Sequence, residues 1–256
     1  MVANPEMSIN QSMTQPMAVL SQGAQELGIH LAEEQIAQFE IYYRELAEWN
    51  EKVNLTAITD YKEVQVKHFL DSLTVCLALE GPPLPGMKII DVGTGAGLPG
   101  LPLKLAFPDV SLALNDSVGK KTRFLHHLIE SLDLADVEVY TGRAEELGQR
   151  PDLREHFDLV VARGVAKLPV LLEYTLPFCK IGGKAMAWKH ADIKKELADS
   201  ESALKTLGGR LGRIIPVQAT GLTDDRVLVA VDKVRLTPAE YPRRPGVPAK
   251  RPIVGS

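Results

Sequence analysis

The chain has 256 residues, of which 45% are hydrophobic and 24% are charged, with a formal net charge of −4 at pH 7. These values are ordinary for a soluble globular protein, and the length suits one large domain or a domain with an extension. Its apolar runs are far shorter than the roughly 20 residues that span a bilayer, so we expect no membrane partner.

The first sixteen residues lack the basic and apolar regions of a secretory signal, and we expect a flexible tail there. The two cysteines, Cys76 and Cys179, lie far apart and form no CxxC pair. Both features predict a reduced protein of the cytoplasm with two structural thiols.

Charge is unevenly distributed along the chain. Residues 17–80 hold eleven acidic and four basic side chains, whereas residues 233–256 hold six basic and one acidic. The basic, Pro-rich tail at 236–256 predicts either a contact with a polyanion or only a solvated tail.

Residues 17–80 form the first predicted structural unit, an N-terminal helical extension. Apolar side chains recur at helical spacing over 17–50, which predicts two helices, and a further amphipathic stretch covers 61–79. The run Gly-Pro-Pro-Leu-Pro-Gly at 81–86 then breaks any helix and marks a boundary.

From residue 87 to 235 short β-rich runs alternate with helical stretches, which predicts βαβ units and a mostly parallel sheet. Two final strands, at 214–218 and 226–231, have a turn and no helix between them. A closing hairpin is expected of methyltransferases and not of dehydrogenase nucleotide-binding domains. The predicted fold is therefore α/β, a Rossmann-like class I methyltransferase with a seven-stranded sheet.

A glycine-rich loop follows the first predicted strand, at Asp91-Val-Gly93-Thr-Gly95-Ala-Gly97-Leu98. It lies where open α/β sheets bind ligands, and its glycines let the backbone approach a ligand closely. Residues 95–100 also match the dinucleotide pattern GxGxxG. Asp91, which can face a cationic methionine group, and Pro99, which removes an N–H from a pyrophosphate site, favour S-adenosylmethionine over NAD.

The next strand ends supply further candidate cofactor contacts. Asp116 and Ser117 follow the second strand, where a carboxylate can accept hydrogen bonds from both ribose hydroxyls or cap the next helix. Ala144 and Glu145 follow the third strand and are candidate adenine contacts, with helix capping as the alternative.

Arg163 ends the fourth strand, where methyltransferases of this fold carry their reaction chemistry. Neither an Asn/Asp-Pro-Pro-aromatic motif for an exocyclic amine nor a nearby cysteine for a pyrimidine ring is present. A purine ring nitrogen, which already has a lone pair, needs neither. A solvated arginine at a strand end is the alternative for Arg163.

His68 and Asp71 lie three residues apart on one predicted helix and suggest catalysis. We favour a structural role, in which this helix packs over the cofactor pocket and His68 bonds to the loop after Asn54. The sequence has no group with metal-ligand spacing, and we expect no metal.

Several longer motifs resemble the RsmG family, also called glucose-inhibited division protein B. The resemblance covers roughly residues 43–252 and rests on WNEKVNLTAI at 49–58, HFLDSL at 68–73, DVGTGAGLPGLP at 91–102, DSVGKK at 116–121, RGVA at 163–166 and YPRRPG at 241–246. Ala162, Gly164 and Asn115 depart from the residues usual in that family.

This resemblance implies methyl transfer from S-adenosylmethionine to N7 of a guanine in 16S ribosomal RNA, with the RNA or the small subunit as partner. It implies cofactor contacts at Gly93, Leu98, Ala144, Glu145 and Arg163. Arg163 would orient the cofactor or bond to guanine O6/N7, and we expect a monomer. Basic side chains expected to hold RNA phosphates are Lys120, Lys121, Arg123, Lys189, Arg243 and Arg244.

Two other classes stay open at this stage, an NAD-dependent oxidoreductase and a non-catalytic RNA-binding protein with the same fold. Asp91, the glycine loop and Asp116 together argue against the second.

Overall fold

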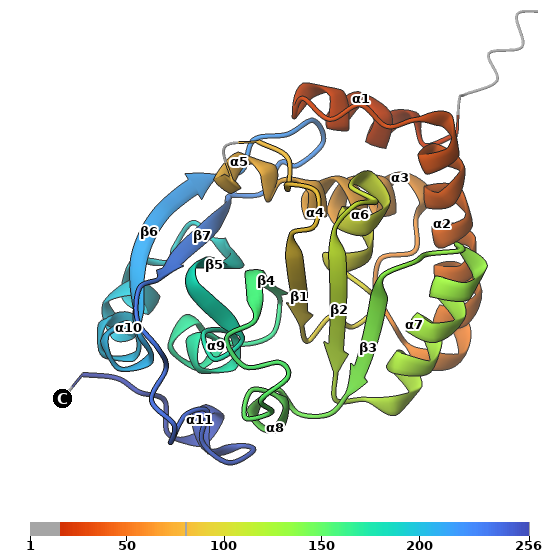
Figure 1. The fold of residues 1–256 in the computed structure, drawn as a ribbon. Coiled ribbons are helices and arrows are strands. Elements are labelled where there is room, and N and C mark those ends of the chain that lie inside the picture. The colour runs from red at the N-terminus through yellow and green to blue at the C-terminus, as the bar shows by residue number, and fades with distance from the viewer. Residues whose placement is uncertain (1–15, 80, 256) are drawn as a thin grey trace, which may run out of the picture.

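The computed structural model describes residues 16–79 and 81–255, which form one seven-stranded sheet in the order β3-β2-β1-β4-β5-β7-β6 (Figure 1). Strands β1 to β5 pair in parallel, and β7 pairs antiparallel with both β5 and β6. The predicted mostly parallel sheet that ends in a hairpin is confirmed. The strands are β1 Lys88–Val92, β2 Ser111–Asp116, β3 Val137–Thr141, β4 Phe157–Arg163, β5 Cys179–His190, β6 Gly209–Pro216 and β7 Arg226–Lys233.

Helices cover both faces of this sheet, as Figure 1 shows. They are α1 Ala18–Glu26, α2 Glu33–Val53, α3 Tyr61–Val64, the π-helix η1 Gln65–Leu70, α4 Asp71–Leu73, α5 Cys76–Leu79, α6 Gly100–Ala106, α7 Gly119–Ser131, α8 Ala144–Leu147, α9 Leu168–Thr175, α10 Lys194–Leu207 and α11 Val247–Lys250. No helix in the described ranges is long and apolar enough to cross a membrane.

The sheet separates two hydrophobic cores because successive strand residues point to opposite faces. Ile89 of β1 lies in the core that holds α1, α2, α6 and α7, whereas Ile90 lies in the core that holds α9 and α10. Val161 and Val160 of β4 divide in the same way. The central strands are buried on both sides, which explains their nearly continuous apolar sequences.

The N-terminal extension shares the first of these cores with the sheet. Two helices, α1 and α2, are present where they were predicted. The amphipathic stretch at 61–79 forms short pieces instead of one regular helix, and η1 lies at its centre. Phe39, Tyr42 and Phe69 from this region are fully buried in the same cluster as Leu101 and Phe124.

The C-terminal segment, residues 236–255, packs back onto the domain. The Arg154 guanidinium donates to the carbonyls of Thr237 at 2.7 Å, Pro238 at 3.1 Å and Tyr241 at 2.8 Å. Helix α11 lies near α9 in the same region (Figure 1). This basic segment is thus attached to the domain at residues 237–241 and at α11. Of the predicted N-terminal tail, residues 1–15 lie outside the described residues.

Candidate functional site

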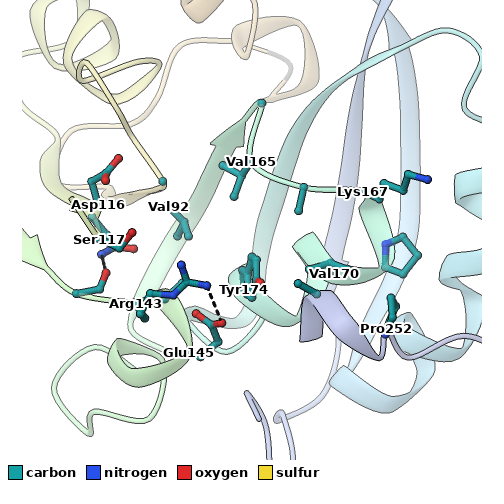
Figure 2. Close-up of a pocket in the computed structure, with 18 of the residues that line it drawn as sticks. Val92, Asp116, Ser117, Arg143, Glu145, Val165, Lys167, Val170, Tyr174 and Pro252 are labelled. Carbon is teal, nitrogen blue, oxygen red and sulfur yellow. Dashed lines mark hydrogen bonds and ion pairs between the residues drawn. The ribbon is translucent and has the colours of Figure 1, made fainter. Parts of the chain in front are cut away.

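A cavity of about 810 Å³ opens at the carboxyl ends of β1, β2, β3 and β4 (Figure 2). Strand order reverses between β1 and β4, and ligands of open α/β sheets bind at such a point. The lining residues come from the ends of these strands and the loops that follow them, from α7, α8, α9 and α10, and from the C-terminal segment. They include Val92, Gly93, Asp116, Ser117, Lys121, Arg143, Ala144, Glu145, Val165, Lys167, Val170, Tyr174, Glu196, Ala249, Pro252 and Val254.

The glycine loop forms the floor of the cavity at the end of β1. Gly93, Gly95 and Gly97 have φ angles of 73°, 60° and 93°, a region that side chains rarely adopt. A Cβ atom on Gly93 would lie 2.7 Å from Cγ2 of Val165, so the close packing of Val165 on the loop requires glycine at this position. Of the four loop residues predicted to contact the cofactor, Gly93 lines the cavity. The other three shape the loop; they are Gly95, Gly97 and Leu98.

Asp116, at the end of β2, joins the glycine loop to the start of α7. Its Oδ2 accepts a hydrogen bond from the Gly95 N–H at 3.0 Å, and its Oδ1 accepts one from the Val118 N–H at 2.8 Å. The residue is 6% exposed and lines the cavity. A carboxylate has about four acceptor positions, so these two bonds leave room for hydroxyl donors of a ligand.

Asp91 lies beneath the loop and does not line the cavity. Its Oδ2 accepts hydrogen bonds from Thr94 Oγ1 and from the Gly100 N–H, both at 2.7 Å, so it holds the two ends of the loop together. Complete burial raises the pKa of this carboxyl to about 7, against the opposing effect of those hydrogen bonds. The predicted contact with a cationic ligand group stays a prediction.

The opposite wall is formed by α8, α9 and the C-terminal segment. Glu145 accepts hydrogen bonds from Arg143 Nη2 at 3.2 Å and from the Gly246 N–H at 2.9 Å, and Figure 2 shows the first of these. Glu145 is almost completely buried, whereas Ala144 lies beside it at the cavity wall. The carboxylate thereby attaches the C-terminal segment to the cavity.

Tyr42 from the N-terminal extension also holds the glycine loop. Its hydroxyl donates to the Ala96 carbonyl at 2.6 Å, and the ring is fully buried. Burial raises the pKa of this phenol well above its ordinary value, so the hydroxyl stays a donor. The sequence showed only an apolar helical position at Tyr42, and no pattern indicated the partner of its hydroxyl.

Arg163, at the end of β4, points toward the N-terminal extension and is not among the lining residues. Its Nη1 donates to Asp71 Oδ2 at 2.6 Å and to the carbonyls of Lys67 and His68 at 3.3 and 3.4 Å. The predicted bond of His68 to the loop after Asn54 is confirmed, because its Nε2 lies 2.7 Å from Thr56 Oγ1. Burial, followed by the charge of Arg163, lowers the pKa of His68 to about 4.

The predicted phosphate-binding cations fall into two groups. Lys120, Arg123 and Arg244 are exposed, and Lys121 is half-buried at the cavity, 4.0 Å from Asp116. The other two form internal ion pairs, which the sequence did not indicate. Lys189 lies 2.8 Å from Glu196, and Arg243 lies 2.6 Å from the buried Glu173.

Several lining residues were missed by sequence reasoning. Val170 and Tyr174 belong to an apolar helix, and Pro252 and Val254 belong to the basic segment that was predicted to contact a polyanion or to form a solvated tail, and not to line a cavity. Both cysteines are buried and unpaired, as predicted. Among the described residues, no three His, Cys, Asp or Glu side chains lie together where they could hold a metal ion.

The sheet order, the closing hairpin and the cavity above the glycine loop define a Rossmann-like methyltransferase fold. A crystal structure of a mutant of MtNAS has this fold, with 16% identity and a TM-score of 0.51 over 84% of this chain and 86% of that chain. The same protein in complex with S-adenosylmethionine matches with 14% identity and a TM-score of 0.51, over 86% of this chain and 78% of that chain.

Sequence comparisons identify the family. The family model of rRNA small subunit methyltransferase G, GidB, matches residues 35–221. The ribosomal RNA small subunit methyltransferase G of Dehalococcoides mccartyi is 47% identical over 93% of this chain and 100% of its own length. That of a Roseiflexus species is 48% identical over the same shares. The chain therefore belongs to the rRNA small subunit methyltransferase G family, and the predicted resemblance is confirmed.

Proposed function

We propose that the protein transfers a methyl group from S-adenosylmethionine to N7 of a guanine in 16S ribosomal RNA of the small subunit. One observation carries the proposal: a cavity with Gly93 at its floor and Asp116 at its wall, in a chain of this family. The names of the relatives support ribosomal RNA of the small subunit as the substrate. The choice of guanine N7 follows from the motifs that resemble the RsmG family.

The residues around the cavity fit S-adenosylmethionine. Gly93 has no side chain, so Val165 packs directly against the backbone, and the two residues together line the floor of the cavity on which a ligand would lie. The Asp116 carboxylate suits the two ribose hydroxyls, and Ser117 lies beside it. Ala144, with the buried Glu145 behind it, suits the adenine. Asp91, Gly95, Gly97 and Leu98 would act by shaping the loop.

The acceptor atom explains which side chains the reaction does not need. Bound S-adenosylmethionine would supply an electrophilic methyl group. Guanine N7 is unprotonated and nucleophilic at neutral pH, so no side chain has to remove a proton. The work of the protein is then to hold N7 in line with the methyl carbon, and such positioning can contribute about 7–11 kcal/mol. The absence of a general base in the predicted set is consistent with this chemistry.

We assign Arg163 to the reacting end of the site. The guanidinium has five N–H donors in a fixed plane, and its contacts in this structure all use Nη1. Its other donors would orient the cofactor or bond to guanine O6 or N7. Both roles place a fixed positive charge near the reacting atoms.

The RNA would approach across the start of α7. Lys120 and Arg123 are exposed there, next to Lys121 at the cavity, and Arg244 is exposed on the C-terminal segment. Because Lys189 and Arg243 are held in internal ion pairs, we leave them out of the proposed phosphate contacts. The salt dependence of RNA binding is the slope of the logarithm of the binding constant against the logarithm of the salt concentration. Replacing Lys120 or Arg123 by Ala should make this slope shallower by about 0.7–0.9 for each phosphate that is no longer neutralised.

Methyl transfer to small subunits tests the proposal directly. The purified protein is incubated with radiolabelled S-adenosylmethionine and small subunits from a strain that lacks the gene. Subunits from the parent strain, in which the target is already methylated, serve as the matched control. Label should enter 16S RNA of the first sample and appear as 7-methylguanosine after digestion. Label on another atom would contradict the N7 assignment, and no label in either sample would contradict the proposed function.

A further inference from the structure

Asp71 lies at the meeting point of the N-terminal extension and two strands of the sheet. It begins α4, directly after the π-helix η1, and is 1% exposed. Its Oδ2 lies 2.6 Å from Arg163 Nη1, and its Oδ1 lies 2.5 Å from Arg226 Nη1. One buried carboxylate therefore pairs with two guanidinium groups.

The two arginines reach Asp71 from the same edge of the sheet as the cavity. Arg163 ends β4, and Arg226 begins β7, which runs antiparallel to β5. Their side chains are 16% and 15% exposed, so neither charge is well solvated. A buried ion pair of this kind leaves an uncompensated charge when one partner is removed. Asp71 thus compensates the charge of Arg163, and it shares the compensation of Arg226 with Asp224.

The backbone around Asp71 is fixed by further hydrogen bonds. The Trp188 indole N–H donates to the Asp71 carbonyl at 3.0 Å and lies 3.2 Å from Thr74 Oγ1. The carbonyls of Lys67 and His68, which also accept from Arg163, belong to η1. A π-helix offsets the carbonyl positions of a regular helix and is often found at functional sites. The extension therefore offers Arg163 a rigid set of acceptors.

We propose that Asp71 is a positioning residue that holds the Arg163 guanidinium at the reacting end of the site. Asp71 and the carbonyls of η1 hold Nη1 from the side of the extension, and Nε and Nη2 of Arg163 would supply the donors for the ligand. The inference rests on the proposed function for its catalytic consequence. The positioning itself is a property of the protein without ligand and can be measured separately.

The substitution Asp71→Asn keeps the size of the side chain and removes its charge. Asp224→Asn is the matched control, because Asp224 pairs with the same Arg226 but lies on the exposed turn before β7 and makes no contact with Arg163. Asp71→Asn should lower kcat by about ten- to a hundredfold, the factor for a lost charge-assisted hydrogen bond. Asp224→Asn should stay within about twofold of the wild type, as is usual for a partly exposed ion pair.

Hydrogen–deuterium exchange provides a readout that does not depend on activity. Asp71→Asn should speed amide exchange at residues 163–167, and Asp224→Asn should leave exchange there unchanged. If Asp71→Asn does not fold, Asp71→Glu keeps the charge but displaces it by one methylene and should show the same two effects. Equal losses of kcat in the Asp71 and Asp224 variants, or unchanged exchange at 163–167, would overturn the inference. An inactive wild-type enzyme with the predicted exchange pattern would refute the proposed function alone.

Discussion

The substitution Gly93→Ala tests whether the glycine loop is shaped by its backbone and by Val165, as the structure indicates. Gly93 has a φ of 73°, and a left-handed conformation costs a residue with a Cβ atom roughly 1–2 kcal/mol. The added Cβ would lie 2.7 Å from Cγ2 of Val165, well inside ordinary contact, and overpacking typically costs about 1–3 kcal/mol. The expected loss in the free energy of unfolding is the sum, about 2–5 kcal/mol.

The two contributions can be separated by a second substitution. Val165→Ala removes the methyl group that the new Cβ would meet, so the double variant should recover the overpacking part and keep only the backbone cost. Urea unfolding of the wild type, both single variants and the double variant measures this, and methyl transfer is assayed in parallel. Turnover should fall in Gly93→Ala because the cavity floor is raised. A Gly93→Ala protein with wild-type stability and turnover would refute the account of the loop, and a double variant no more stable than Gly93→Ala would refute the role of Val165.

Three further predictions concern residues that support the site. Tyr42→Phe should leave the buried Ala96 carbonyl without its donor and lower the free energy of unfolding in urea by about 1–3 kcal/mol. The variant should also bind S-adenosylhomocysteine more weakly. Unchanged stability and unchanged binding would contradict a role of the N-terminal extension in holding the glycine loop. The folded-state pKa of Asp91, about 7, lies above its ordinary 3.8. As pH falls, the Asp91 carboxyl is therefore protonated in the folded protein before it is protonated in the unfolded chain, and the free energy of unfolding should rise by up to about 1.4 kcal/mol per pH unit between about pH 7 and pH 4. Urea unfolding across this range should show the rise in the wild type and not in Asp91→Asn. The same pH dependence of stability in both proteins would exclude this role of Asp91. Arg243→Ala should destabilise the protein by about 3–5 kcal/mol, because it leaves the completely buried carboxylate of Glu173 without its partner. Arg244→Ala, at the exposed neighbouring position, should change stability by about 0.5 kcal/mol or less. Equal thermal unfolding temperatures of the two variants would contradict this prediction.

Local sequence patterns predicted the sheet well. Residues 88–92 hold three β-branched side chains between Gly86 and Gly93, and β1 occupies the same residues. The hairpin was predicted because only a short polar turn separates its two apolar runs. The glycine loop itself is longer than its glycine spacing indicates: it continues to Pro99, and α6 begins at Gly100, whose N–H donates to Asp91.

Contacts between distant residues account for most of what the sequence could not predict. The periodicity of residues 61–79 indicated an amphipathic helix but could not show a π-helix, which depends on packing and not on spacing. The C-terminal segment has the composition of a tail, yet side chains of Arg154 and Gln149, about 90 residues earlier, donate to its carbonyls. The ion pairs of Asp71 join residues 92 and 155 positions apart, and no local pattern encodes them.

Calorimetric titration with S-adenosylhomocysteine, the demethylated product, tests most directly whether the glycine loop forms the cofactor site. NADH, the ligand of the alternative dehydrogenase class, is the control under identical conditions. If the glycine loop forms this site, S-adenosylhomocysteine should give saturable heat at one site per chain, and NADH should give none. No heat with either S-adenosylhomocysteine or S-adenosylmethionine would contradict it.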